Sequence, residues 1–561
     1  MTDLEIPYEK DRRGHYRFFE VLPGTLSYLL LVAPVILSII DVKLAVFFIL
    51  AYLLIFFVRS MAYSTRAIIG YMTMRQHMKL DWPALVADVE TGHPTTEKAK
   101  RPKWHIKALE RMAERPDRIK PSELKHAVII ATVNESREVL EPTIQAVANS
   151  DYDPKQIILV MAYEGRAGKE SEDRVQELIR VYGDKFYHAM AVKHPAGIPG
   201  EVIGKGGNVT HAGRQLEKYL KKEKIDPAKV VVTTLDADNR PDRRYLPALS
   251  YVYCVAPNPL NVSYQPLPMF TNNIWDAPML MRVIAVGNNL FYIVGTQRQH
   301  QARNFSAHAQ SMRALIDMDF WSVRTVVEDG HHFWRSYFHF DGKYRVYPIS
   351  IPIYQDAVLA DGYLRTIKAQ FYQLRRWTYG ASDIAYVADK GFYHKNKANK
   401  FDVLSKFLYL LQNHVNWATN AILVLVAAFI PPFFHPQSLA ANELPLIVSR
   451  IQRVGVASLL IMVYVSMVTL PPRPARYRRH HSVLMILQWV LLPVTGIAFG
   501  SLAAFNSQTR LMFKKYLSKF DVTEKATVIA SGKRVSTKAD PGVVKKARKH
   551  RLRLRLRRHR G

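Results

Sequence analysis

The stretch Val231-Val232-Thr233-Thr234-Leu235-Asp236-Ala237-Asp238 decides the fold. β-Branched residues followed by two carboxylates two positions apart are typical of a buried strand that ends at the edge of a sheet. At such an edge, side chains converge on a ligand outside the sheet. Carboxylate oxygens are hard ligands, so Asp236 and Asp238 are predicted to hold Mg²⁺ or Mn²⁺ together with a substrate diphosphate. The alternative is an ordinary acidic turn, because Asp-x-Asp is common by chance.

Other β-branched runs accompany this strand on its N-terminal side. Residues 127–133 and 156–162 form short apolar runs that are bounded by polar loops and alternate with helical patterns. Such runs predict the buried strands of an α/β domain, which we expect over residues 121–400. Residues 61–120 are expected to connect this domain to the segment before it, because residues 88–120 are rich in Pro, Lys, Glu and Thr.

The N-terminal end of the chain is apolar. Residues 22–40 and 44–58 each approach the length of about 20 helical residues that crosses a bilayer, so residues 1–60 are predicted to form a transmembrane hairpin. Lys and Arg flank the outer ends of the pair, which places both ends in the cytoplasm by the positive-inside rule. These cations are Lys10, Arg12, Arg13, Arg17, Arg59, Arg66 and Arg75. A buried hairpin of a soluble protein is the alternative.

The C-terminal end is apolar as well. Residues 407–430, 446–470 and 483–505 are candidate spans, and residues 401–510 are therefore predicted to be a transmembrane region. The basic loop 471–479 is expected to be cytoplasmic. A third complete crossing would place the basic residues after Lys514 outside the cell. Because Pro493 and Gly496 interrupt the last segment, a re-entrant pair of half-helices is the other possibility. Both remain open.

The charge of the chain is strongly positive. The 561 residues carry 78 Lys and Arg against 47 Asp and Glu, a net charge of +31, which is typical of nucleic-acid binders. Ten of these cations lie in residues 545–560, within a predicted basic tail over 511–561. Beside an anionic leaflet each such charge is worth about 1 kcal/mol, so we expect the tail to bind anionic membrane lipid and consider nucleic acid unlikely. A merely solvated tail is the alternative. The single cysteine, Cys254, excludes an intrachain disulfide.

Further motifs occur in order along the chain. They are Asn134-Glu135 after the first strand, Val327-Glu328-Asp329-Gly330, Gln373-Leu374-Arg375-Arg376-Trp377, Gln508-Thr509-Arg510-Leu511 and Phe520-Asp521-Val522-Thr523-Glu524-Lys525. Together with Asp236 and Asp238, this series resembles the bacterial type of membrane-bound glycosyltransferase family 2, which contains cellulose, chitin and hyaluronan synthases. The resemblance covers about residues 120–400, and the flanking apolar segments match that architecture.

The resemblance implies a GT-A fold and a role for each acidic motif. Asp236 and Asp238 would hold the divalent metal and the diphosphate of the donor. Asp329 would be the general base that deprotonates the acceptor hydroxyl, and Glu328 would help to position it. Attack at an anomeric carbon needs a carboxylate within hydrogen-bond reach and neutralisation of the leaving diphosphate. A single displacement would invert the anomeric centre and give a β-linked product from an α-linked donor.

On the acceptor side, the resemblance implies that Gln373, Arg376 and Trp377 bind the acceptor. An indole is a flat platform for a sugar face, and an arginine can pair with a diphosphate. The alternative is an amphipathic helix that lies on the membrane with its cations near headgroups. The two interpretations are compatible, because the motif of the family lies on such an interfacial helix.

On the donor side, the segment Gly204-Lys205-Gly206-Gly207-Asn208 lacks the spacing of a P-loop. The resemblance implies that Lys205 approaches the nucleotide; a solvated lysine in a turn is the alternative. Asn134 and Glu135 are expected to contact the donor as well. The family has Asp residues after its second strand, whereas here only Glu164 could serve. A UDP-sugar is the favoured donor.

The surroundings of the predicted base depart from the family pattern. Val327 stands where the family has threonine, which removes one hydroxyl contact. His331, His332 and His339 follow closely, but no spaced Cys/His set accompanies them, so we expect them to be structural. Cellulose synthases have an acceptor-binding loop that differs from the corresponding residues here, Asn304-Phe305-Ser306-Ala307-His308-Ala309-Gln310. The identity of the acceptor therefore cannot be inferred from the family.

The sequence therefore predicts a multi-pass glycosyltransferase of the plasma (inner) membrane with a cytoplasmic catalytic domain. It would move a sugar from a nucleotide-sugar donor to a saccharide or lipid-linked acceptor, and it could be a processive polysaccharide synthase. One alternative is a non-processive transferase onto a polyprenyl phosphate or glycolipid. An alternative of another class is a non-catalytic membrane scaffold that uses the basic tail.

Overall fold

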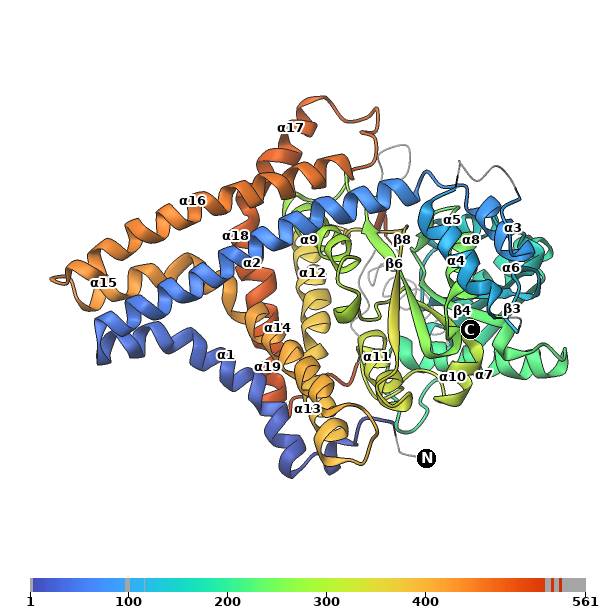
Figure 1. The fold of residues 1–561 in the computed structure, drawn as a ribbon, viewed down its shortest axis with the longest axis horizontal. Helices are drawn as coiled ribbons and strands as arrows, with labels where there is room; N and C mark the ends of the chain where they lie inside the picture. The colour runs from blue at the N-terminus through green and yellow to red at the C-terminus, as the bar shows by residue number, and fades with distance from the viewer. Residues whose placement is uncertain (1–3, 96–100, 116, 520–525, 529–533, 537–561) are drawn as a thin grey trace, which may run out of the picture.

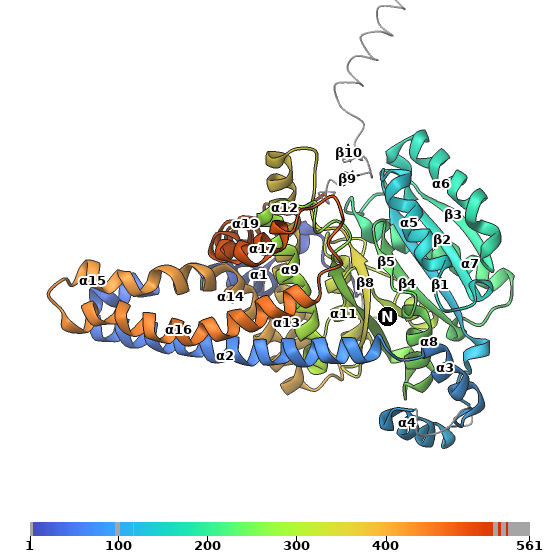
Figure 2. The ribbon, with the colours of Figure 1, turned by 90° about the horizontal axis from the view of Figure 1, so that it is seen from above.

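The computed structural model of the chain describes residues 4–95, 101–115, 117–519, 526–528 and 534–536. It consists of an α/β domain and a bundle of long helices that projects from one side of it (Figures 1 and 2). The helices of the bundle come from the N-terminal and C-terminal parts of the chain, on either side of the α/β domain in sequence. The basic run 545–560 and the Phe520–Lys525 motif lie outside the described residues, so the predicted lipid contact of the tail stays a prediction.

The α/β domain is built on an eight-stranded mixed sheet of order β3-β2-β1-β4-β7-β6-β8-β5. The strands are β1 Lys125–Thr132, β2 Ile157–Glu164, β3 His188–His194, β4 Val230–Asp236, β5 Arg240–Pro241, β6 Val262–Phe270, β7 Ala309–Ser311 and β8 Arg345–Gln355. The first four in the spatial order are parallel, whereas β7 runs antiparallel to both β4 and β6. The strands predicted near residues 127–133, 156–162 and 230–235 are β1, β2 and β4. A separate antiparallel pair joins β9 Ala526–Val528 to β10 Arg534–Ser536.

Helices cover both faces of the sheet, and this is why the strands β1, β2 and β4 are largely apolar and buried. The helices of this domain are α5 Arg137–Ala148, α6 Lys169–Tyr182, α7 Lys205–Lys222, α8 Tyr245–Val255, α9 Met279–Gly295, α10 Met312–Asp317, α11 Glu328–His339, α12 Tyr363–Thr378 and α13 Asp383–Ala388. Along β1, Val128 and Ile130 pack with α5 and α8, whereas Ala127 and Ile129 pack with α7 and α10. The predicted α/β domain is confirmed.

Five helical segments are long and apolar enough to cross a membrane. They are Gly14–Ile40, Val42–His77, Lys400–Phe434, Leu439–Val468 and His480–Met512. They contain α1 Gly14–Ile40, α2 Val42–His77, α14 Lys400–Val426, α15 Ile430–Phe434, α16 Leu439–Val468, α17 His480–Leu487, α18 Leu492–Thr495 and α19 Leu502–Met512. These segments, at both ends of the chain, suggest a multi-pass membrane protein. Helix α2 continues past the predicted boundary at residue 60, because no Pro or Gly interrupts it where its first arginines appear.

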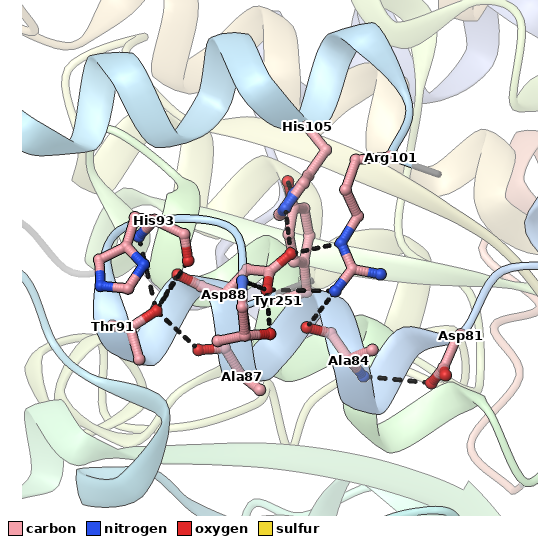
Figure 3. Close-up of polar contacts among 10 residues, drawn as sticks. Asp81, Ala84, Ala87, Asp88, Thr91, His93, Arg101, His105 and Tyr251 are labelled. Atoms are coloured by element: carbon pink, nitrogen blue, oxygen red, sulfur yellow. Dashed lines mark hydrogen bonds and ion pairs between the residues drawn. The ribbon is translucent and has the colours of Figure 1, made fainter. Parts of the chain in front are cut away.

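The predicted connector is folded and docked. It contains α3 Trp82–Thr91 and α4 Lys103–Ala113, which a buried polar network ties to α8 (Figure 3). The Asp88 carboxylate accepts a hydrogen bond from Arg101 Nε at 2.5 Å, and its Oδ2 lies 3.1 Å from His105 Nε2. The other ring nitrogen of His105 lies 2.9 Å from the Tyr251 hydroxyl. This network holds the connector against the domain and gives the buried charges partners.

Candidate active site

The carboxyl ends of four parallel strands meet at one edge of the sheet. In register, Ala131 of β1 pairs with both Ala162 of β2 and Asp236 of β4, and Glu164 of β2 pairs with His194 of β3. Polar residues that end these strands or directly follow them therefore share one edge. This is the edge where ligands bind in open α/β sheets.

Lys205 begins α7 and turns its ammonium group toward this edge. Its Nζ lies 2.7 Å from Asp236 Oδ1 and donates to the Ser306 carbonyl at 3.1 Å. The side chain is only 10% exposed, so a solvated lysine in a turn does not describe it. Burial acts to lower the pKa of Lys205, but the carboxylates of Asp236, Glu328 and Asp329 outweigh burial and raise it. Lys205 is thus a buried cation within an acidic cluster.

The glycines beside Lys205 allow α7 to approach its neighbours closely. A Cβ on Gly206 would lie 2.3 Å from the Ser322 carbonyl oxygen and 3.1 Å from Glu328 Cβ. Two residues later, the Asn208 amide donates to the carbonyl of Ala162 at 3.0 Å, and so fixes the helix to the end of β2. The glycine-rich segment therefore joins the strand edge to the residues that begin α11.

Asp238 lies in the tight turn after β4 and is almost fully buried. Its Oδ2 accepts a hydrogen bond from the backbone N–H of Asp356 at 3.1 Å, just after β8. The Asn239 side chain accepts from the Asp236 N–H at 2.6 Å and thereby fixes the turn. The sequence interpretation did not include Asp356, although an acidic residue just after a strand could have indicated it.

The two aspartates fit a hard divalent cation that is shared with substrate phosphates. Asp236 and Asp238 offer only oxygen donors, which suit Mg²⁺ or Mn²⁺ held by one or two carboxylates and completed by a ligand. In the described part of the chain, no three His, Cys, Asp or Glu side chains are grouped for an all-protein metal cage. His331 Nδ1 instead lies 2.8 Å from Asp383, and His332 Nε2 lies 2.5 Å from Gln310 Oε1. Both histidines take part in internal hydrogen bonds, as expected for structural residues.

Glu328 and Asp329 form the first turn of α11 beside Lys205. Glu328 is almost fully buried. Burial and repulsion by Asp329 raise the pKa of Glu328. Burial likewise raises the pKa of Asp329, although the charges of Lys205 and Arg376 act against it. The two adjacent carboxyl groups therefore hold protons more tightly than ordinary acids do, which is typical of general bases.

Helix α12 brings the third motif toward the acidic pair. The charge of Arg376 acts on both Glu328 and Asp329, as expected if its guanidinium faces them. Gln373 is placed one helical turn before Arg376 and accepts a hydrogen bond from Gln370 at 3.0 Å. The half-buried Trp377 ring lies 6.0 Å from that of Phe270.

Aromatic rings that sequence reasoning missed continue from Trp377. The Tyr292 ring centroid is 6.3 Å from that of Phe270 and 4.9 Å from that of Phe305. Phe305 directly precedes Ser306, whose carbonyl accepts from Lys205. No motif marks these residues in the sequence, because they come from α9 and from a loop that departs from the family pattern. They extend an aromatic surface from α12 to the loop at Lys205.

The remaining predicted donor residues lie at the expected edge with different surroundings. Asn134 is exposed in the loop after β1. Glu135 accepts from the Thr132 hydroxyl and the Val133 N–H, both at 2.7 Å, and so braces that loop. Glu164 is buried and its Oε2 accepts from Arg166 Nε at 3.0 Å. Of these three, Glu164 has the environment most typical of a binding residue.

A histidine that the sequence interpretation missed adjoins Glu164. His194, at the end of β3, lies 3.4 Å from Glu164 Oε2 through Nδ1 and 3.0 Å from Glu201 Oε2 through Nε2. Burial acts to lower the pKa of His194, but the two glutamates outweigh it and raise the pKa. A lone histidine in a strand carries no sequence signal, so only the fold assigns it to this edge.

No family model matches the chain, and no curated protein sequence matches it. Among solved structures, the mannosyltransferase PcManGT from Pyrobaculum calidifontis, in complex with GDP-Man and Mn²⁺, is 13% identical with a TM-score of 0.38, and the match covers 81% of this chain and 100% of that one. S. aureus TarS 1–349 with UDP-GlcNAc is 12% identical with a TM-score of 0.35, over 73% and 96%. GalNAc-T7 with UDP, GalNAc and Mn²⁺ is 12% identical with a TM-score of 0.32, over 52% and 58%. These likenesses concern the fold alone.

Proposed function

We propose that the protein is a membrane glycosyltransferase that uses a nucleotide-sugar donor. The observation that carries the proposal is the meeting of three motifs at one sheet edge. Lys205 pairs with Asp236, and its charge acts on Glu328 and Asp329 together with that of Arg376. Buried acids with raised pKa values beside a buried lysine are typical of a catalytic site rather than of a scaffold.

The donor diphosphate is assigned to the Lys205–Asp236 region. Asp236 and Asp238 would hold a divalent cation, which supplies positive charge opposite the diphosphate when bound. Lys205 is already buried there and would transfer part of its pairing from Asp236 to the diphosphate. Glu164 and His194 lie at the neighbouring strand ends, where the nucleoside would be held, and a UDP-sugar remains the favoured donor.

The transfer step is assigned to the acidic pair of α11. Asp329 takes the proton of the acceptor hydroxyl while the hydroxyl oxygen bonds to the anomeric carbon. The bond from that carbon to the diphosphate breaks, and the diphosphate departs with the electron pair. Glu328 would help to position Asp329. This single displacement inverts the anomeric centre, so an α-linked donor gives a β-linked product.

The acceptor is assigned to α12 and the aromatic surface beside it. The partly buried Trp377 and Tyr292, which pack beside the core residue Phe270, offer apolar rings that suit a sugar, and Gln373 and Arg376 supply polar contacts. The acceptor is a saccharide or a lipid-linked molecule, and the catalytic domain faces the cytoplasm at the plasma membrane. A processive synthase would release long products, whereas a transferase onto a polyprenyl phosphate or glycolipid would add one sugar.

The test is a panel of nucleotide sugars offered to the reconstituted protein with Mg²⁺ or Mn²⁺. We expect nucleoside diphosphate release with one donor, and the length of the product decides processivity. Asp329→Asn should abolish transfer but retain donor binding, whereas Asp317→Asn, an exposed acid on α10, should leave both unchanged. Transfer at the wild-type rate by Asp329→Asn would contradict the assigned base. Absence of donor binding across the panel would instead favour the scaffold.

A further inference from the structure

The last apolar segment, His480–Met512, runs in a direction unlike that of the other four. Helices α1, α2, α14 and α16 project together from the α/β domain toward α15. The segment of α17, α18 and α19 instead runs across that direction, beside α12 and α9 (Figures 1 and 2).

Both ends of this segment are fixed to the α/β domain. Before it, Trp275 Nε1 donates to the Pro471 carbonyl at 3.1 Å, and Arg476 pairs with Asp276 at 2.7 Å. After it, the Leu517 N–H donates to the Tyr379 hydroxyl at 3.2 Å, and Lys519 forms a β-bridge with Ile203. A segment that crossed the bilayer would place these two anchors on opposite sides of the membrane.

The segment is also bound to this domain along its length. Arg282 of α9 donates from Nε to Gln488 Oε1 at 2.8 Å, and the Ser507 hydroxyl donates to the Arg375 carbonyl of α12 at 2.6 Å. Helix α9 is in turn fixed to the sheet, because the Asn289 side chain accepts from the Phe270 N–H at 2.7 Å. Charged residues such as Arg282 and Arg375 are costly in the hydrocarbon core, so these helices cannot follow the segment across it.

The outward face of the segment suits a lipid surface. Val483, Ile486, Leu487, Val490 and Val494 are exposed, and Val490 is 79% exposed. Exposed Arg478 and Arg479 precede the segment, and exposed Lys514 and Lys515 follow it. Apolar side chains between clusters of cations are typical of a helix that lies in the headgroup region. The segment also packs against α1 and α14 of the four-span bundle.

We propose that His480–Met512 neither crosses the membrane nor enters it as half-helices, but lies along the bilayer surface beneath the catalytic domain. The chain then crosses four times. Its start, the catalytic domain, the loop 471–479 and residues 513–519 all share one side, and the loop 435–438 between α15 and α16 lies on the other. This proposal does not rest on the proposed transferase activity.

Single-cysteine labelling tests the sidedness. The native Cys254 is buried, so the full chain without an added cysteine should react little with the maleimide. Lys221→Cys on α7, Arg478→Cys and Ser518→Cys should react with an impermeant maleimide from the same side of sealed vesicles, and Gln437→Cys only from the other. Reaction of Ser518→Cys from the side of Gln437→Cys would overturn the proposal. Reaction of Gln437→Cys from the side of Lys221→Cys would overturn it as well.

A depth measurement separates a surface helix from half-helices. Nitroxides are attached in turn at Val494→Cys, halfway along the segment, and at Leu54→Cys on the exposed side of α2. Relaxation by oxygen against a water-soluble nickel chelate reports depth. The label at position 494 should lie distinctly shallower than the label at position 54. Equal depths would overturn the proposal whatever the labelling showed, and neither readout requires a sugar donor.

Discussion

At the scale of single residues, Lys205 carries the clearest prediction. Its ammonium is buried beside Asp236, so a donor diphosphate would meet a cation already desolvated and positioned. Charge-assisted hydrogen bonds contribute about 1.5–3 kcal/mol, so Lys205→Ala should weaken binding of the nucleoside diphosphate by about 10- to 100-fold. Titration calorimetry on the reconstituted protein measures this. Lys221→Ala, on the exposed side of the same helix, is the matched control; equal affinities in both variants would remove Lys205 from the donor site.

The pH dependence of transfer follows from the raised pKa values of Glu328 and Asp329. A general base must be deprotonated, so the rate at saturating donor should rise with pH and level off above the pKa of the pair. The midpoint should lie above the ordinary carboxyl range of about 4. Lys205→Ala removes a positive charge that acts to lower the pKa of Asp329, and should therefore shift the midpoint to higher pH. A shift to lower pH would contradict this coupling.

Gly206 predicts a steric effect. An added Cβ would lie 2.3 Å from the Ser322 carbonyl, a backbone atom that cannot move alone. Gly206→Ala should therefore displace the chain before α11 and cost about 1–3 kcal/mol of unfolding free energy, with loss of transfer. Gly287→Ala on α9 is the control, because its Cβ meets nothing within 4 Å. Thermal unfolding in detergent compares the two; equal midpoints would mean that the close approach is not constraining.

At the scale of elements, the strands could be predicted from the sequence, whereas the packing of the connector on the α/β domain could not. The strands β1, β2 and β4 lie near their predicted ranges because short β-branched runs bounded by polar loops favour strands that are covered on both faces. The connector shows the opposite case. Its charged sequence indicates exposure, yet Asp88, Arg101 and His105 are buried because they satisfy one another across α3 and α4. Pairing between distant residues leaves no local pattern.

The domain division at residues 60, 120, 400 and 510 stays a prediction.

The buried network of the connector carries a stability prediction. Asp88→Ala would leave Arg101 and His105 buried without their carboxylate, and breaking such a pair costs about 3–5 kcal/mol. Unfolding in detergent should therefore begin at distinctly lower temperature. Asp81→Ala removes only the N-terminal cap of α3 and should cost about 1 kcal/mol. If the two variants unfold at the same temperature, the network does not hold the connector.

At the scale of the whole molecule, the roles of the cations and of the apolar segments depend on where they lie in the structure. The net charge of +31 does not require a nucleic acid, because cations lie around the long helices and in the basic tail. Length and hydropathy select five segments that could cross a membrane. Contacts at both ends of the fifth distinguish it from the others, and this difference arises only when the helices are packed on the α/β domain.

By itself, the sequence determined the α/β class, the long apolar segments at both ends and the motifs that carry the candidate chemistry. These features are local, because periodicity, hydropathy and short spacings depend only on residues that are close together in the sequence. Only the tertiary structure brought Lys205 to Asp236, Arg376 toward the acidic pair, and Tyr292 and Phe305 beside the Trp377 surface. The physical reason is that these groups are separated by tens to hundreds of residues and meet only after the strands have aligned their ends. Their pKa values, and hence their chemistry, depend on that burial and proximity.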